Sequence, residues 1–308
     1  MKFCLAVFVA LCFVFPGALP AATTAGAKAP LEVLVLGSGG PRALGRAGSS
    51  FIVLLDGTPR ILVDAGPGAF FRIGELDVDL SQVDTVLLTH LHIDHSSDFP
   101  AFLNARSLTS DGPITYNIFG PDGAGLFPKT SHFVQSMIGD DGAFPYQKTF
   151  GVREKFSVHD LAIALDSAST KIVDEGGLVV EEIATHHGDC PSVAYRITYK
   201  GRTVVFSGDM DASAIPNLVR LAKDADLLIF NCAVLDPPES PEQLYELHTP
   251  PRKIGMAAKQ AGVKSLLLSH LAPDVLSRED EVRKSIGANF AGPVAFAADS
   301  MRVMVGGK

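Results

Sequence analysis

Short apolar runs rich in valine, leucine and isoleucine recur along the chain, and glycine or proline bounds most of them. Such runs are typical of buried β-strands, and they occupy residues 31–36, 51–55, 61–63, 83–88, 114–119, 179–184, 193–199, 203–207, 227–230 and 264–268. Apolar residues recur at helical spacing in four other segments, which are residues 97–108, 124–137, 212–223 and 251–261. Strands interleaved with helices over most of the chain predict an α/β layered domain.

One segment, residues 139–177, shows neither the apolar runs of strands nor the apolar spacing of helices clearly, and we expect it to form a peripheral excursion. Elsewhere we find no internal repeat and no linker, so we predict one catalytic domain over residues 31–308. The chain has 308 residues, of which 47% are hydrophobic. That content is ample for a buried core and excludes a disordered protein.

The first residues predict an export signal. Lys2 is followed by thirteen apolar residues, 3–15, then by a Pro-Gly pair and small residues. This order is typical of a secretory signal peptide, which we assign to residues 1–22, with cleavage between residues 18 and 27. Thirteen residues at about 1.5 Å each do not span the ~30 Å core of a membrane. We therefore expect no stable membrane anchor and a periplasmic or secreted protein.

The charge balance limits the partners that we expect. Lysine and arginine number 26 against 34 aspartates and glutamates, which gives a net charge of −8. Because there is no basic surplus to bind phosphate backbones, we expect no duplex nucleic acid as a partner. The cysteines are too few for a disulfide scaffold. Only Cys190 and Cys232 lie beyond the signal peptide, and a disulfide between them stays open.

The strongest chemical signal follows the fourth predicted strand. Residues 89–95 read Thr-His-Leu-His-Ile-Asp-His, which places His90, His92, Asp94 and His95 within six residues. Residues two apart face the same way in an extended chain, so His90 and His92 can bind one cation. A turn after them lets Asp94 and His95 bind a second cation. This density of imidazole and carboxylate groups indicates a metal site rather than a polar strand end.

Two tetrahedral sites need more ligands, and other predicted strands end on suitable residues. His186 and His187 follow one strand, Asp209 follows another, and His270 follows a third. Ligands at successive strand ends can gather at one edge of a sheet, where loops give access. Asp64 also follows a strand, and we expect it to brace the metal-binding loop through hydrogen bonds.

These residues together resemble the metallo-β-lactamase superfamily, and most closely its ribonuclease Z and arylsulfatase-like branch. The matching segments extend over nearly all of the predicted mature chain, and they are residues 36–41, 62–66, 89–95, 187–196 and 261–270. The resemblance implies an αββα metallo-β-lactamase sandwich with two metal ions at one edge of its facing sheets. It also implies two ligand triads with a shared carboxylate: His90, His92 and His187; Asp94, His95 and His270; and Asp209 as the bridge.

Two zinc ions suit this ligand set, although manganese or iron is compatible with the same ligand types. His187 is preferred to His186, because the family's ligand precedes a Tyr-Arg pair by about eight residues and Tyr195 meets that spacing. A thiolate ligand from Cys190 is a weaker alternative, since Asp209 already fills the bridging position.

The resemblance further implies hydrolysis by a hydroxide that the two ions share. Asp94 and His248 are the predicted catalytic residues. His248 lies 22 residues before His270, at the spacing of a proposed general acid in ribonuclease Z-like enzymes. The alternative is a histidine that caps the following helix. The family usually has a glutamate beside this histidine, and we align Asn231 there; an amide cannot hold an imidazolium by charge.

The predicted function is an exported dinuclear zinc hydrolase of a small ester, either a phosphodiester or a sulfate ester. Arg42 or Arg46 would meet the anionic group, unless they are ordinary surface arginines. Ribonuclease Z activity itself is not expected, because residues 197–204 leave no room for a transfer-RNA-binding arm. Two alternatives are a lactone or β-lactam hydrolase and a non-catalytic periplasmic zinc-binding protein. The sequence leaves a homodimer open.

Overall fold

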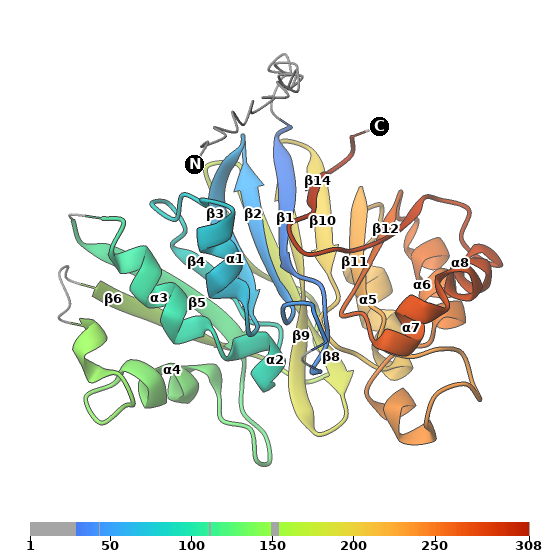
Figure 1. Cartoon of the computed structure of the whole chain (residues 1–308), viewed down its shortest axis with the longest axis horizontal. Coiled ribbons are helices and arrows are strands. Elements are labelled where there is room, and N and C mark those ends of the chain that lie inside the picture. The colour runs from blue at the N-terminus through green and yellow to red at the C-terminus, as the bar shows by residue number, and fades with distance from the viewer. Residues whose placement is uncertain (1–28, 43, 111, 149–153, 308) are drawn as a thin grey trace, which may run out of the picture.

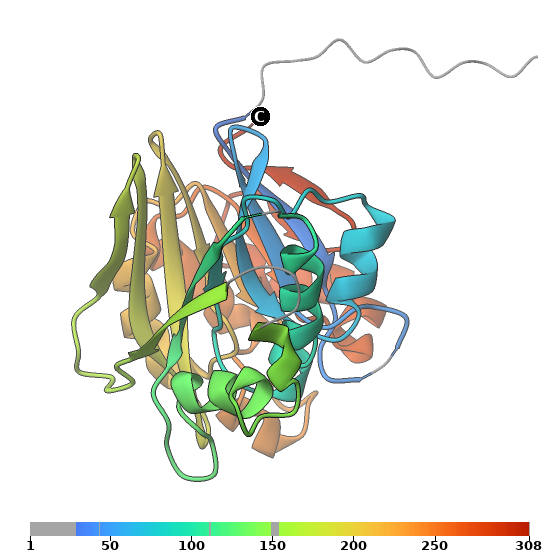
Figure 2. The ribbon, with the colours of Figure 1, turned by 90° about the vertical axis from the view of Figure 1, so that its left-hand side faces the viewer.

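Two β-sheets lie face to face in the computed structural model, which describes residues 29–42, 44–110, 112–148 and 154–307 (Figure 1, Figure 2). Each sheet has seven strands within these residues. The first has the order β14-β1-β2-β3-β4-β5-β6, and the second has the order β13-β12-β11-β10-β9-β8-β7. The predicted signal peptide lies outside the described residues.

The elements have the following bounds. The first sheet comprises β1 (Leu31–Gly37), β2 (Ser50–Leu55), β3 (Thr58–Ala65), β4 (Thr85–Leu87), β5 (Ile114–Pro121), β6 (Glu154–Leu161) and β14 (Arg302–Met304). The second sheet comprises β7 (Thr170–Glu175), β8 (Leu178–His187), β9 (Cys190–Tyr199), β10 (Arg202–Phe206), β11 (Leu227–Asn231), β12 (Leu266–Ser269) and β13 (Val294–Phe296). The α-helices are α1 (Ala69–Glu75), α2 (Ile93–Ser96), α3 (Phe99–Ser107), α4 (Thr130–Ile138), α5 (Ile215–Leu221), α6 (Pro251–Ala261), α7 (Pro273–Ser277) and α8 (Glu279–Gly287). Short 3-10 helices are η1 (Pro145–Lys148), η2 (Ala212–Ala214) and η3 (Glu242–Glu246).

Three apolar layers hold these elements together. Alternate residues of one strand enter different layers: Val33 of β1 packs between the two sheets, whereas Leu34 packs under the helices outside the first sheet. Helices α1, α3 and α4 cover that outer face, and α5, α6 and α8 cover the outer face of the second sheet (Figure 1). Strands buried on both faces read as continuous apolar runs. The predicted αββα sandwich is confirmed.

Two sequence-based expectations are wrong in detail. The segment 139–177 is not a peripheral excursion, because β6 and β7 lie within it and each forms the edge of a sheet. Their side chains are mostly exposed or half-buried, which conceals the strand pattern. The helix expected over residues 124–137 begins only at Thr130, since Gly125 has a left-handed backbone and Pro128 interrupts helical hydrogen bonding.

None of the helices in the described part of the chain is both long enough and apolar enough to cross a bilayer. Helices α1, α3, α4, α5, α6 and α8 instead pack over the faces of the sheets, each with one apolar side inward.

Glu182 is a buried carboxyl group on β8, opposite Tyr195 of β9 and Thr170 of β7. Burial raises the pKa of Glu182 to about 7, and a hydrogen bond from Thr170 offsets only part of the effect. The folded protein therefore keeps a proton that the unfolded chain loses near pH 4.5. Stability is then lost as the pH rises from the unfolded pKa through the folded one.

Glu182→Gln removes this charge without changing the size of the side chain. We expect the variant to exceed the wild type in unfolding free energy by about 2 kcal/mol near pH 8 and to match it near pH 4, in urea denaturation. Glu181→Gln is the matched control, because the neighbouring Glu181 is partly exposed beside Arg196. Equal stability of the Glu182 variant and the wild type near pH 8 would contradict the prediction.

Candidate metal centre

One edge of the sandwich collects polar residues from both sheets. Strands β8, β10, β11 and β12 run parallel to one another, so their carboxyl ends lie at the same edge of the second sheet. His187 ends β8, Asp209 follows β10, and His270 follows β12. The loop after β4 brings residues 89–95 to this edge from the first sheet, near the label α2 in Figure 1.

The segment from His90 to His95 is extended first and helical afterwards. His92 has an extended backbone and precedes the single turn of α2, which carries Asp94 and His95. The hydroxyl of Ser96 donates to the His92 carbonyl at 2.9 Å and holds the turn closed. This change of conformation sends His90 and His92 to one group of ligands, and Asp94 and His95 to another.

His90, His92 and His187 form the first group. The Nδ1 atom of His92 lies 3.2 Å from Nε2 of His90 and 3.2 Å from Nε2 of His187. Burial lowers the pKa of His90 well below its usual value and also lowers the pKa of His187. Neutral imidazoles keep a ring lone pair, and one shared cation would satisfy all three of these nitrogens.

Asp94, His95 and His270 form the second group. The Oδ2 atom of Asp94 lies 3.0 Å from Nε2 of His270 and 3.7 Å from Nε2 of His95. The His95 Nε2 atom is buried and has no hydrogen-bond partner among the described residues. An orphaned ring nitrogen in a buried site is costly unless a ligand satisfies it.

Asp209 lies between the two groups. Its Oδ2 atom is 3.2 Å from Nε2 of His270 and 3.6 Å from Nε2 of His95 in the second group. The same oxygen is 3.5 Å from Nε2 of His187 and 3.9 Å from Nε2 of His90 in the first. Burial raises the pKa of Asp209, but His270 and His95 outweigh this effect and hold the pKa well below its usual value. The donor set therefore fits divalent metal ions.

Two alternatives from the sequence find no support in this geometry. His186 points away from the cluster and pairs through Nδ1 with Asp211 at 2.8 Å. Burial raises the pKa of Cys190 to about 12, which favours a thiol over the thiolate that binds metal. Cys190 and Cys232 are both buried and unbonded, so the disulfide is not formed.

Asp64 supports the second group from the end of β3. Its carboxylate accepts hydrogen bonds from Thr89 N at 2.7 Å and from Thr89 Oγ1 at 2.8 Å, and it contacts His95 Nδ1 at 2.8 Å. The contact with Nδ1 turns the His95 Nε2 atom toward the cluster. Asp64 and His270 both have a left-handed backbone, with φ of 55° and 54°. The bracing contacts expected of Asp64 are present.

His248 lies beside the two triads, and it forms a further group of possible metal ligands with His187 and Asp209. Its ring centroid is 5.3 Å from that of His187 and 5.5 Å from that of His270. Burial lowers the pKa of His248 to about 4, and its Nδ1 atom is buried without a partner in the described part of the chain. The catalytic role of His248 stays a prediction.

A cavity of about 440 Å³ adjoins His248 and His270. Its wall combines glycine and apolar residues with arginine, including Gly40, Arg42, Leu244 and Leu271. A Cβ atom at Gly40 would lie only 2.9 Å from Cε1 of His270, so the backbone passes directly over this histidine. The volume is in the range of small-molecule sites, and the opening gives a substrate access to the cluster.

The two arginines predicted to meet an anion differ in their surroundings. Arg46 also lines the cavity, but its Nη1 atom donates to Ser38 Oγ at 2.7 Å and to the Ala297 carbonyl at 2.8 Å. These bonds tie the guanidinium to the fold. Arg42 is exposed at the same cavity, which leaves it the better placed of the two to meet an anion.

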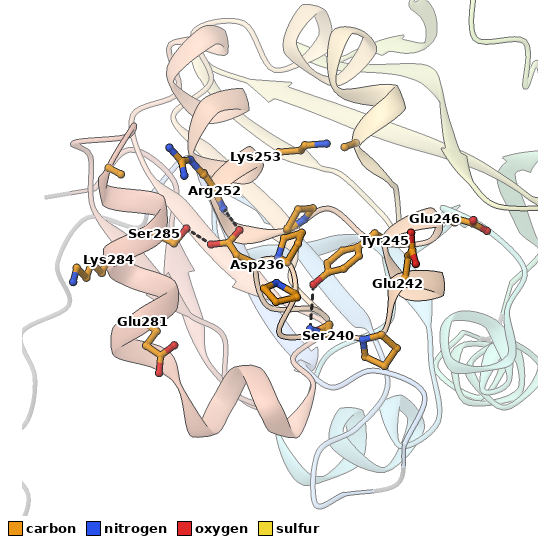
Figure 3. A pocket seen from close by; sticks show the side chains of 16 residues that line it. Asp236, Ser240, Glu242, Tyr245, Glu246, Arg252, Lys253, Glu281, Lys284 and Ser285 are labelled. Atoms are coloured by element: carbon orange, nitrogen blue, oxygen red, sulfur yellow. Dashed lines mark hydrogen bonds between the residues drawn. The ribbon is translucent and has the colours of Figure 1, made fainter.

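A larger cavity, about 1590 Å³, is lined by the segment from Asp236 to Glu246 together with residues of α6 and α8, and none of the cluster residues lines it (Figure 3). Asp236 accepts a hydrogen bond from Arg252 N at 2.9 Å and another from Ser285 Oγ. These bonds tie the segment to α6 and α8. Ser240 lines both cavities, so this segment forms a wall between them.

Asn231 has a different partner from the one that the sequence suggests. We aligned it with a residue beside His248, but its Nδ2 atom donates to Asp209 Oδ1 at 2.6 Å. Sequence spacing could not reveal this contact, because Asn231 ends β11 and Asp209 follows the neighbouring strand β10.

Comparisons with known proteins agree with this architecture. Residues 44–247 match the family model described as the metallo-beta-lactamase superfamily. Ribonuclease Z of Mycobacterium avium is 28% identical over 290 residues, which cover 89% of this chain and 98% of the relative. The metallo-beta-lactamase fold protein YhfI of Bacillus subtilis has a TM-score of 0.67 at 24% identity, covering 89% of this chain and 98% of that one. The short form of human tRNase Z has a TM-score of 0.67 at 23% identity, covering 89% and 99%.

These relatives overturn one expectation from the sequence. We expected a small-molecule ester as the substrate and no duplex nucleic acid as a partner, but relatives named for a ribonuclease align over 89% of the chain. The expectation is wrong. Net charge is a sum over the whole molecule, whereas a phosphate group is bound by the few groups around it.

Asp64→Asn tests the support of the second group. The amide keeps the size of the side chain and tolerates a left-handed backbone, but it accepts fewer hydrogen bonds than the carboxylate. We expect zinc affinity to fall about 10- to 100-fold in a competition titration with a chromogenic chelator.

Asp56→Asn is the matched control for this titration. Asp56 also has a left-handed backbone, with φ of 50°, but its carboxylate pairs with Lys200 at 2.7 Å in a surface turn. The control should bind zinc as the wild type does. Equal zinc affinity in the two variants would remove Asp64 from the support of the metal centre.

Proposed function

The chain belongs to the metallo-β-lactamase superfamily of metal-dependent hydrolases, and from that premise we propose that it is a dinuclear zinc phosphodiesterase that cleaves RNA. The observation that carries the proposal is the position of Asp209, whose Oδ2 atom lies within 3.9 Å of ring nitrogens from both ligand groups. A carboxylate oxygen shared by two triads suits a pair of ions. The ribonuclease relatives support a phosphodiester substrate.

Seven side chains would hold the ions in this proposal. The first triad comprises two histidines from the loop after β4 and one from the end of β8; the second comprises Asp94, His95 and His270; and Asp209 is shared. When bound, such ions supply Lewis acidity and lower the pKa of water toward neutrality. Asp94 would take part in catalysis by holding one ion together with His95 and His270.

The cavity beside the cluster would receive the RNA. Arg42 is exposed at this cavity, and its guanidinium suits a phosphate oxygen. Leu244 and Leu271 offer an apolar wall against which a base can pack. His248 lines the same cavity and is neutral at pH 7, so it carries one ring N–H that can donate to the phosphodiester. We propose that this contact orients the bond to be cleaved.

The activity is tested on purified zinc-loaded protein with a short single-stranded RNA. We expect cleavage by the wild type and a fall of about 100-fold in turnover for His248→Ala, with zinc content unchanged. His159→Ala is the matched control, because His159 is exposed on β6 and stacks on Phe119. Unchanged turnover in the His248 variant would remove this residue from the reaction.

The same assay separates the proposed substrate from other esters. Cleavage of p-nitrophenyl sulfate or a lactone by the zinc-loaded wild type, without any cleavage of RNA, would contradict a ribonuclease. A wild type that holds zinc and hydrolyses none of these compounds would favour a zinc-binding protein instead.

We also propose, from the apolar run at residues 3–15, that the protein is exported. Cell fractionation followed by mass spectrometry of the amino terminus should find the protein outside the cytoplasm, without residues 1–22 or with a nearby cleavage. An intact amino terminus in the cytoplasmic fraction would contradict export, and it would leave the proposed chemistry untouched.

A further inference from the structure

The two oxygens of Asp209 have different surroundings. Oδ2 faces ring nitrogens of both ligand groups, with His270 nearest at 3.2 Å. Oδ1 instead accepts a hydrogen bond of 2.6 Å from Nδ2 of Asn231. Both side chains are buried, so water does not compete for this contact. The hydrogen bond therefore determines which oxygen is available to the metal centre.

The Asn231 amide is itself held in place. Asn231 is the last residue of β11, a central strand that pairs with β10 on one side and β12 on the other. Its backbone N–H donates to Ser207 Oγ at 3.1 Å, and the Ser207 hydroxyl donates to the Gly208 carbonyl at 2.7 Å. Two adjacent strand ends thus fix the donor relative to its acceptor.

The backbone before Asp209 is equally constrained. Gly208 has φ of 60°, and a Cβ atom at this position would lie 2.8 Å from Cβ of Thr89. The chain therefore turns tightly against the loop of the first sheet before it presents the carboxylate. The backbone at Gly208 and the side-chain amide of Asn231 are both fixed. The hydrogen bond between Asn231 and Asp209 therefore restricts rotation of the Asp209 carboxylate.

We propose that Asn231 is a positioning residue that keeps Asp209 a one-oxygen ligand shared by two ions. A carboxylate with both oxygens free can turn and bind one ion through both of them, which would leave the other ion a ligand short. Turning would here break a buried hydrogen bond to a charged acceptor, which is among the stronger hydrogen bonds in proteins. The inference rests on the proposed dinuclear centre and adds a residue that no ligand pattern contains.

A neutral donor suits this position better than a charged group. A second carboxylate at 231 would place two anions at hydrogen-bond distance in a buried site, where like charges disfavour each other strongly. An amide donates one hydrogen and leaves the charge of the metal centre unchanged.

The test compares zinc binding by the full-length wild type, Asn231→Ala and Asn231→Leu. Zinc-reconstituted protein is dialysed against a chelator of graded strength, and bound zinc is measured by elemental analysis. We expect two ions per chain in the wild type and one tightly held ion in both variants, with the second bound at least about tenfold more weakly. The melting temperature of each metal-free protein is measured in parallel.

Asn217→Ala is the matched control. Asn217 is also a buried asparagine, but its amide donates to the carbonyls of Leu165 and Ala184, away from the metal centre. It should keep two ions at the wild-type affinity, even where its melting temperature falls. Two ions of wild-type affinity in both Asn231 variants would overturn the inference.

A zinc-loaded crystal structure of the wild type tests the inference without a variant, should the substitutions prevent folding. We expect Oδ2 of Asp209 to contact both ions while Oδ1 keeps its bond to Asn231. Separate oxygens of Asp209 on separate ions would overturn the inference and leave the dinuclear centre standing. A wild type that retains no zinc would overturn the proposed function itself, so the two failures are distinguishable.

Discussion

The convergence of buried ring nitrogens on one carboxylate oxygen is the constraint on which the rest of the structure depends. His90 and His95 reach Asp209 from the first sheet, while His187 and His270 reach it from the second. Neither sheet alone supplies both ligand groups. The apolar layer between the sheets, with Val63 and Ile229 among its members, therefore sets the geometry of the metal centre as well as the stability of the fold.

Much of this arrangement could be predicted because most strands have a recognisable sequence pattern. A strand buried on both faces appears as an apolar run, and a polar residue at its end is then a candidate for the sheet edge. That reasoning placed His187, Asp209 and His270 together although long segments separate them in the chain. It failed for β6 and β7, because edge strands with exposed side chains lack the apolar signal.

Contacts between neighbouring strand ends could not be predicted in the same way. The partner of Asn231 depends on the register of β10 and β11, and the bonds of Arg46 to Ser38 and Ala297 depend on how the ends of the described chain pack. The prediction of the substrate class was wrong for another reason. Net charge describes the whole surface, whereas in the proposed function a phosphate would be surrounded by a few residues such as Arg42 and His248, which line one cavity.

The left-handed backbones of Asp64 and His270 have a consequence for how this protein can change over time. Each residue occupies a conformation that glycine or asparagine adopts more readily. A substitution that relieves this backbone strain would therefore also remove the side chain that the site uses. A lineage that gained stability by replacing either residue would lose a contact at the metal centre. Substitutions that change stability can therefore accumulate in the helical layers, whereas at Asp64 and His270 the contacts of the metal centre oppose them.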